Sequence, residues 1–192
     1  MDLDGTITRK DTMFAFARFC HPGAGYFVRL LRTAPVLLLN RLGIYPSERA
    51  KERLLTSFFR GTTREHFERK GDEFSQIVLP KLVRRRAMKE IEWHRNNNSV
   101  IVVVTASLGA WCREWCRLQG FDLIATQYEA VNNVITGKLQ GKNCKGSEKV
   151  RRIREKYSPG SAHTIYAYGD TKSDLPMLEL ADVKYYKWRQ IK

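Results

Sequence analysis

Residues 100–104 constrain the fold of this chain more than any other segment. The run Val-Ile-Val-Val-Val is β-branched and apolar throughout, which is typical of a strand buried on both faces of a parallel sheet. A second short run at residues 164–168, Thr-Ile-Tyr-Ala-Tyr, predicts another such strand. Parallel sheets are covered by helices on both faces, so the sequence predicts an α/β protein.

The stretch Asp2-Leu3-Asp4-Gly5-Thr6 carries two carboxylates that can serve one reaction centre. Side chains at i and i+2 of an extended segment point to the same face, so Asp2 and Asp4 can reach one ligand. Gly5 lets the backbone turn away without a side chain in the ligand's path. A calcium-binding EF-hand loop is excluded, because its glycine stands at the sixth position and here it stands at the fourth. An isolated pattern of this kind is often only an acidic surface turn, so further signals are needed.

Three further polar signals follow the predicted strands or precede a helix. Thr105 ends the first of the two strands, and Lys145 lies at the entrance of a helix that Ser147 is expected to cap. Asp170 and Asp174 come just after the second strand. Ligands of open α/β sheets bind outside the carboxyl ends of the strands, so these side chains are predicted to meet at one edge of the sheet.

In this order, the Asp pair, the hydroxyl, the lysine and the Gly-Asp-x-x-x-Asp pattern resemble the four motifs of the haloacid dehalogenase superfamily. The stretches V-T-A-S, T-G-K-L-x-G-x-N-C-K-G-x-E-K-V-R-R-I and Y-A-Y-G-D-x-x-x-D-x-x-M-L extend the likeness to subfamily IB. That group contains phosphoserine phosphatases and phosphatidylglycerophosphatase C-like proteins. The resemblance spans nearly the whole chain. It implies a Rossmann-like parallel sheet core with an inserted helical cap, and magnesium-dependent hydrolysis of phosphomonoesters.

The resemblance also implies a role for each motif residue. Asp2 would be the nucleophile and Asp4 the general acid and base, Thr105 and Lys145 would bind the phosphate, and Asp2, the Asp4 backbone carbonyl and Asp170 would hold Mg²⁺, with Asp174 supporting the metal or Lys145. The chemistry favours such a set independently of the family. A phosphomonoester dianion resists an anionic nucleophile, so cationic groups must first reduce its charge. Asp4 must start protonated to donate to the leaving alkoxide.

The organisation of the chain is predicted from the spacing of its motifs. About ninety residues separate the first motif from the strand at 100–104, too many for a connection within a compact domain. Residues 12–80 have helical apolar patterning and are predicted to form a cap, with residues 1–11 and 81–192 forming the α/β core. Only Met1 precedes Asp2, so the first core strand is missing and we expect a short apolar segment upstream in the authentic protein.

Residues 25–42 predict an amphipathic helix with a wide apolar face and a narrow stripe that includes Arg29, Arg32 and Arg41. The arginines argue against a membrane-spanning helix, and Pro35 is expected to kink it. Two alternatives stay open. The helix lies among the headgroups of an anionic membrane, or its apolar face packs inside the cap.

The net charge of +14 indicates attraction to an anionic partner, whether a membrane surface, a phosphorylated substrate or a nucleic acid. No nucleic-acid module signature accompanies the basic clusters, so nucleic acid is not favoured. One cluster, which includes Lys149, follows Lys145 and is interpreted as a solvated helix face. Cys112 and Cys116 are predicted to lie on a packed face, and the first residues lack the apolar region of a signal peptide. These features predict a reduced, cytoplasmic setting, with peripheral membrane contact as an option.

Asp11 stands nine positions after Asp2, where phosphoserine phosphatases place a glutamate that holds the substrate's amino group. Asp11 either does this with a shorter reach or caps a helix that begins near Met13, and the capping role is favoured. No cap arginine aligns with the one that grips the serine carboxylate, which lowers phosphoserine as the substrate. The leading hypothesis is a phosphatase of a lipid or membrane-associated phosphate. The alternatives are a phosphoserine phosphatase and a non-catalytic basic module that binds an anionic surface. The oligomeric state has no signal in the sequence.

Overall fold

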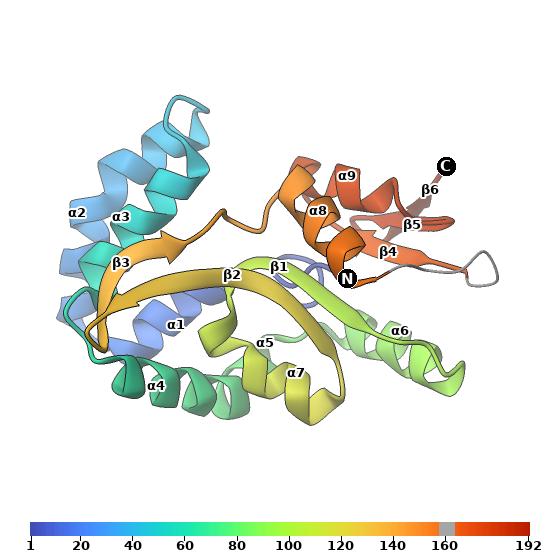
Figure 1. Cartoon of the computed structure of the whole chain (residues 1–192), viewed down its shortest axis with the longest axis horizontal. Coiled ribbons are helices and arrows are strands. Elements are labelled where there is room, and N and C mark those ends of the chain that lie inside the picture. The colour runs from blue at the N-terminus through green and yellow to red at the C-terminus, as the bar shows by residue number, and fades with distance from the viewer. Residues whose placement is uncertain (158–163) are drawn as a thin grey trace.

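The computed structural model describes residues 1–157 and 164–192, and over these residues it has two three-stranded sheets flanked by helices (Figure 1). The first sheet has the order β1-β2-β3 and the second the order β4-β5-β6. In each sheet the first pair of strands is parallel and the second pair antiparallel. The strands are β1 (Val102–Leu108), β2 (Asp122–Val131), β3 (Val134–Gln140), β4 (Tyr166–Gly169), β5 (Val183–Tyr186) and β6 (Arg189–Ile191). The α/β class predicted from the sequence is confirmed.

β1 confirms the buried strand predicted at residues 100–104, but it lies further along the chain. It begins at Val102 and continues to Leu108, so Thr105 lies inside the strand and not after it. Val103, Val104 and Thr105 are all buried. β1 is therefore a buried strand whose carboxyl half carries the predicted hydroxyl group.

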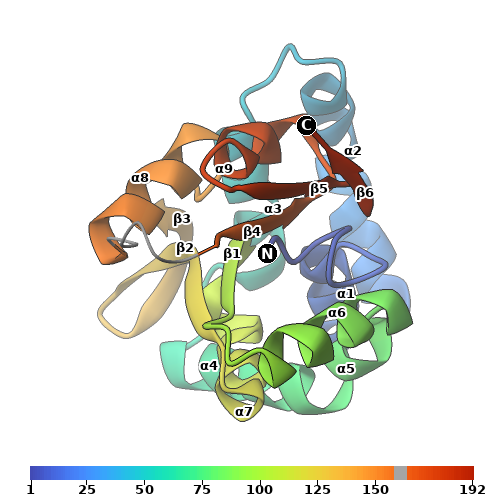
Figure 2. The same ribbon diagram turned by 90° about the vertical axis from the view of Figure 1, so that its right-hand side faces the viewer.

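Residues Met1 and Asp2 connect the two sheets. The Met1 nitrogen donates a hydrogen bond to the Val102 carbonyl oxygen at 2.7 Å, and the Val104 nitrogen donates to the Met1 carbonyl oxygen at 2.9 Å. On the other side, the Asp2 nitrogen donates to the Tyr168 carbonyl oxygen at 2.9 Å. Figure 2 shows this segment between β1 and β4. These bonds hold Asp2 between the two sheets, and the apolar segment expected upstream stays a prediction.

Helices form most of the chain before β1. They are α1 (Thr12–Cys20), α2 (Ala24–Arg41), α3 (Ser47–Phe59), α4 (Arg64–Ile77), α5 (Leu79–Leu82) and α6 (Arg85–Asn96). After β1 come η1 (Gly109–Trp111), α7 (Arg113–Gln119), α8 (Ser147–Lys156), η2 (Lys172–Asp174) and α9 (Leu175–Leu178). Asp11 caps α1, because its side-chain oxygen accepts a hydrogen bond from the Met13 nitrogen at 2.9 Å. The favoured role of Asp11 is thus confirmed. The cap expected from Ser147 is absent, since Ser147 is the first residue of α8 and Gly146 precedes it as N-cap.

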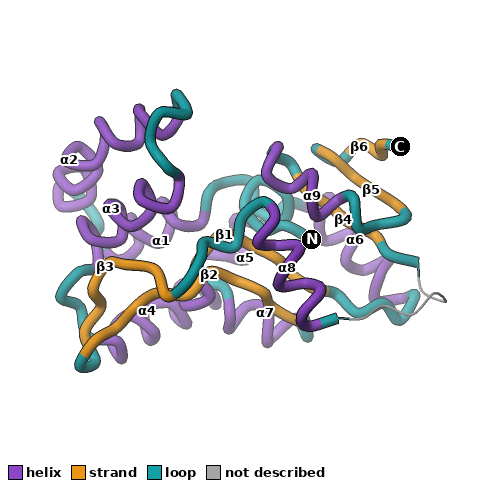
Figure 3. Tube along the Cα trace, turned by 45° about the horizontal axis from the view of Figure 1, so that its top comes forward, coloured by secondary structure: helices purple, strands orange, loops and turns teal. Residues whose placement is uncertain are grey.

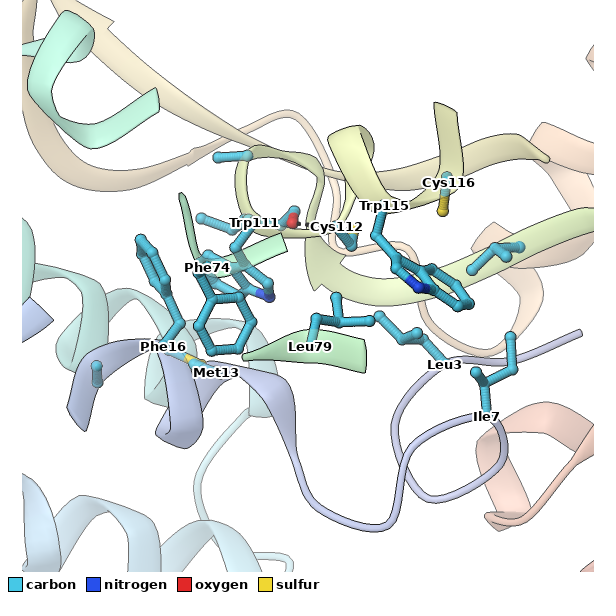
Figure 4. Packing of buried hydrophobic residues seen from close by; sticks show 14 of the residues in the cluster. Leu3, Ile7, Met13, Phe16, Phe74, Leu79, Trp111, Cys112, Trp115 and Cys116 are labelled. Carbon is cyan, nitrogen blue, oxygen red and sulfur yellow. Dashed lines mark hydrogen bonds between the residues drawn. The ribbon is translucent and has the colours of Figure 1, made fainter. Parts of the chain in front are cut away.

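The buried core runs without a break from the N-terminal segment into the helices before β1. Phe16 of α1 is fully buried in it, with its ring 4.9 Å from that of Trp111 and 5.4 Å from that of Phe74 between centroids. Leu3 and Ile7 belong to the same cluster (Figure 4). The division into a core and a cap at residues 12–80 stays a prediction, because one continuous cluster joins the two parts.

The predicted packed face around Cys112 and Cys116 is confirmed. Both thiols are free and buried in this cluster, next to the buried rings of Trp111 and Trp115 (Figure 4). Burial raises the pKa of the Cys116 thiol to about 12. These cysteines therefore act as small apolar side chains in packing.

The β2–β3 hairpin reaches from the sheet into the helical region. Its turn has positive φ at Asn132 (49°) and Asn133 (63°), a conformation that asparagine tolerates and that suits a two-residue hairpin turn. A β-bridge joins Thr63, just before α4, to Val134 at the start of β3. Figure 3 shows the hairpin running past α4 toward α3. The helical region thus rests on a curved antiparallel ribbon that belongs to the first sheet.

α2 confirms the helix predicted at residues 25–42, with Pro35 inside it. One side of the helix packs inward and the other is exposed, and the contact with a membrane stays a prediction. Leu30 and Leu37 pack against the core cluster, whereas Phe27, Leu31 and Leu38 are 60%, 74% and 60% exposed. The large exposed apolar side chains continue into the turn after the helix, with Leu42 and Ile44. The helix therefore presents an apolar outer face as well as an inner one.

Candidate active site

A buried lysine joins two buried aspartates between the sheets. The Lys149 Nζ donates a hydrogen bond to Asp2 Oδ1 at 2.5 Å and to Asp174 Oδ1 at 2.7 Å. The Lys149 and Asp174 side chains are each 2% exposed and that of Asp2 is 9% exposed. Such a shielded triad is costly to desolvate, so its charges depend on one another.

Lys145, the lysine expected at this position, lies elsewhere. Its Nζ donates to Ser47 Oγ at 3.0 Å, an exposed contact with the start of α3. Lys145 belongs to the loop before α8, whereas Lys149 lies within the first turn of that helix and so points between the sheets. The interpretation of Lys149 as part of a solvated face is wrong, because the residue is 1% exposed. Ile153, four residues later on the same helix face, is an apolar neighbour that could have signalled a buried face.

The Asp170 carboxylate lies directly against the backbone of Gly5. Gly5 has a φ of 86°, and a Cβ at that position would lie 2.2 Å from Asp170 Oδ2. Only glycine therefore allows this close approach. Thr6 Oγ1 donates to Asp170 Oδ1 at 3.1 Å and orients the carboxylate.

Asp2, Asp170 and Asp174 each offer an oxygen within 4.8 Å of the others. Clustered carboxylate oxygens are the ligands that Mg²⁺ prefers, so the donor set fits such an ion. The cluster joins Asp2 and Asp170, both predicted metal ligands, with the predicted supporting residue Asp174. Asp4, predicted to add its backbone carbonyl, has its side chain directed elsewhere.

The Asp4 carboxylate is held by two donors on its own side of the site. Ser107 Oγ donates to Asp4 Oδ2 at 2.5 Å, and the Thr12 nitrogen donates to Asp4 Oδ1 at 2.7 Å. The Thr12 hydroxyl lies 2.9 Å from Ser107 Oγ. The Trp111 Nε1 donates a hydrogen bond to this Thr12 hydroxyl at 3.1 Å. Sequence analysis did not assign a role to Ser107 or Thr12. The alternation of a strand provides the signal for Ser107, which lies two residues after Thr105 on the same face.

Thr105 is fully buried in β1, and its Oγ1 accepts a hydrogen bond from the Ser107 nitrogen at 2.9 Å.

The Asp174 carboxylate is held by Thr171 on the side away from Lys149. Its Oδ2 accepts bonds from the Thr171 nitrogen at 3.0 Å and the Thr171 hydroxyl at 2.7 Å, in a capping box around η2. Asp174 thus connects Lys149 to the loop that carries Asp170.

Burial sets the proton affinities in the site. It raises the pKa of Asp2 to about 7, although the Lys149 ammonium opposes this. Burial also raises the pKa of Asp170. Asp174 is the exception, because Lys149 and the Thr171 donors outweigh its burial and hold its pKa below the usual value. A further cation, in addition to Lys149, would therefore favour the ionised form of Asp2 at neutral pH.

The Asp11 carboxylate lies near Asp4 and near a lysine from the helical region. Burial, followed by the charge of Asp4, raises the pKa of Asp11 to about 6, and the Lys51 ammonium acts in the opposite direction. Lys51 of α3 is thus a cation close enough to Asp11 to affect its pKa.

An aspartate pair near the start of the chain, a buried lysine and a second aspartate pair after β4 meet at the strand ends of an α/β fold, which is where enzymes of this fold class place their active sites. The chain belongs to the haloacid dehalogenase-like hydrolases, whose family model matches residues 1–179. It is 33% identical over 190 residues to Protein CicA of Caulobacter vibrioides, covering 97% of this chain and 83% of that protein.

Solved structures share this fold. A protein of unknown function from Bordetella pertussis Tohama I has a TM-score of 0.78 and 22% identity, covering 96% of this chain and 86% of that one. A phospho-aspartyl intermediate analogue of phosphoserine phosphatase has a TM-score of 0.61 and 16% identity, covering 96% and 83%. In residues 1–157 and 164–192, no helix has both the length and the apolar character needed to cross a membrane.

Proposed function

We propose that this chain is a magnesium-dependent phosphomonoester hydrolase that acts through an aspartyl-phosphate on Asp2. The observation that carries the proposal is the buried contact of Asp2 with Lys149 beside Asp170 and Asp174. A nucleophilic carboxylate must stay ionised next to a phosphate dianion, and Lys149, together with a metal ion that the three carboxylates would hold, would supply the positive charge that this requires. The structure of an aspartyl-phosphate analogue in a phosphoserine phosphatase of the same fold supports the same chemistry.

Asp2 and Asp170, with the Asp4 backbone carbonyl as predicted from the sequence, would hold Mg²⁺. When bound, the ion reduces the charge of the phosphate and polarises its oxygens. Lys149 takes the phosphate-binding role that the sequence predicted for Lys145, and Asp174 keeps its ammonium in place. Thr105 is proposed to donate a hydrogen bond from its hydroxyl to the phosphate. The hydroxyl accepts a hydrogen bond from the Ser107 nitrogen, and its own proton is still available to donate.

The reaction has two balanced steps. In the first, an Asp2 carboxylate oxygen bonds to phosphorus, the bond from phosphorus to the ester oxygen breaks, and Asp4 gives its proton to the leaving alkoxide. In the second, Asp4 takes a proton from a water molecule whose oxygen attacks phosphorus, and the bond between Asp2 and phosphorus breaks. The Ser107 and Thr12 donors fix the Asp4 carboxylate for both proton transfers.

We also propose that the substrate is a lipid or membrane-associated phosphate. The support is the outer face of α2, where Phe27, Leu31 and Leu38 are exposed together with Arg32. An apolar helix face with cationic edges and a strongly basic chain are suited to an anionic lipid surface. Phosphoserine stays the alternative substrate, and the cation near Asp11 in the structure is Lys51.

Turnover of para-nitrophenyl phosphate tests the catalytic proposal. The wild type is expected to hydrolyse it only with added magnesium, and Asp2→Asn is expected to lose all turnover while keeping its circular dichroism spectrum. Asp72→Asn, on α4, serves as the matched control. Beryllofluoride should bind the wild type in the presence of magnesium and should not bind Asp2→Asn. Full activity of Asp2→Asn would refute the mechanism, and absence of turnover in the wild type would favour the non-catalytic module.

A further inference from the structure

Lys51 crosses from α3 into the rim of the site. Its Nζ donates a hydrogen bond to the Ala106 carbonyl oxygen at 2.5 Å and to Asn143 Oδ1 at 2.6 Å. Both acceptors are neutral. Ala106 immediately precedes Ser107, which donates to the proposed acid and base Asp4. Lys51 therefore lies on the Asp4 side of the site, where a leaving group would be protonated.

A second lysine lies where the start of α3 meets the loop at residues 143–145. Lys145, in the loop before α8, donates to the hydroxyl of Ser47, the first residue of α3. Next to it, Glu48 Oε1 accepts a hydrogen bond from the Asn143 nitrogen at 3.0 Å. The first turn of α3 and the loop at residues 143–145 are thus joined by direct contacts, with one lysine contributed by each.

These two ammonium groups differ from that of Lys149. In the described part of the chain, neither has a carboxylate within ion-pair distance, whereas Lys149 has two. Burial lowers the pKa of Lys51 to about 8, Asp4 and Asp11 oppose this from beyond contact distance, and Lys145 adds repulsion. Because each ammonium contacts only neutral oxygens, each can still form a charge-assisted hydrogen bond with an incoming anion.

We propose that Lys51 and Lys145 bind a second anionic group of the substrate, on its leaving-group side. The substrate class is then a phosphomonoester whose alcohol portion carries a carboxylate, a phosphodiester or another phosphate. This inference rests on the proposed function, because the leaving group is defined by the roles of Asp2 and Asp4. Asp11 limits where that anion can lie, since its carboxylate would repel a group placed on the α1 side of Lys51.

Matched substrate pairs test this assignment. Glycerol 3-phosphate and 3-phosphoglycerate differ by a hydroxymethyl group and a carboxylate, and pentane-1,5-diol monophosphate and bisphosphate provide a longer spacing. The wild type is expected to show a kcat/KM at least tenfold higher for the anionic member of one pair, mainly through a lower KM. Lys51→Gln and Lys145→Gln should each reduce that ratio about tenfold, and Lys51→Arg should retain most of it.

The control is Lys138→Gln, which removes an exposed lysine of β3 and should leave the ratio between the paired substrates unchanged. Circular dichroism spectra and thermal melts establish that each variant is folded. Equal loss for both members of a pair in Lys145→Gln, or a wild-type preference for the neutral members in both pairs, would overturn the assignment. If para-nitrophenyl phosphate is not hydrolysed either, the proposed function fails. If it is hydrolysed and the enzyme does not distinguish the members of the substrate pairs, only the anion-binding role of Lys51 and Lys145 is refuted.

Discussion

Replacing Lys149 by Met removes the buried ammonium and preserves most of the volume of its side chain. Asp2 and Asp174 are then left facing each other, almost completely shielded from water. Each loses a charge-assisted hydrogen bond of 2.5 Å or 2.7 Å. The variant must either bury two uncompensated negative charges or take up protons.

The magnitude follows from the burial of the three groups. Removing one partner of a buried ion pair costs about 3–5 kcal/mol, which is a large part of the total stability of a domain. The cost should be largest near pH 8. In the wild type Lys149 holds the pKa of Asp174 low, so the triad's contribution is lost as the pH falls through that value. The variant's carboxylates take up protons at higher pH, so the difference in stability between the two proteins shrinks toward pH 5.

Catalysis should fall as well. Burial already raises the pKa of Asp2 to about 7, and loss of the ammonium raises it further, so less of the nucleophile is ionised. The charge aimed at the phosphate is also lost, which typically costs about 100-fold to 1,000-fold in kcat.

Urea unfolding followed by tryptophan fluorescence at pH 8 and pH 5, without metal, measures the stability of Lys149→Met. Turnover of para-nitrophenyl phosphate with magnesium measures its activity. Lys145→Met is the comparison, because that lysine lies only four positions earlier and its contact is exposed. Its free energy of unfolding should change by less than about 0.5 kcal/mol. A loss below about 1 kcal/mol in Lys149→Met, or a larger loss of stability in Lys145→Met, would refute the assignment.

Gly71→Ala should destabilise the protein by about 1–3 kcal/mol in urea unfolding, because the new Cβ would lie 1.9 Å from the Ala110 carbonyl oxygen. Gly25→Ala, in α2, is the control and should leave stability equal or up to about 1 kcal/mol higher, so equal losses in both variants would contradict the packing argument. Co-sedimentation with vesicles of phosphatidylglycerol and phosphatidylcholine should fall as salt is added, and Leu31→Gln should weaken it. Val100→Gln removes a comparably exposed apolar side chain outside α2 and should bind as the wild type does; binding to neutral vesicles alone would contradict the electrostatic part of the proposal.

The residue pattern alone was sufficient for the local structure. The valine run predicted β1, and the pair Asn132-Asn133 is of a kind that favours a hairpin turn. Asp11 predicted the cap of α1. Each of these depends on neighbours close in the chain, because β-branching, positive φ and capping are decided within a few residues. The acidic cluster was also predictable in part. Asp2 lies on an extended segment and Asp170 follows a predicted strand, so both were expected at the same edge of the sheet.

Which lysine contacts Asp2 was decided only by the tertiary structure. Lys145 and Lys149 are both basic residues at the start of one helix, and their spacing alone could not show which one meets Asp2, 147 residues away from Lys149 in the chain. The same holds for Lys51, which contacts Asn143 only because α3 packs beside the loop before α8. Charge pairing depends on which surfaces face each other after packing, and a pattern of neighbours along the chain contains no such distance.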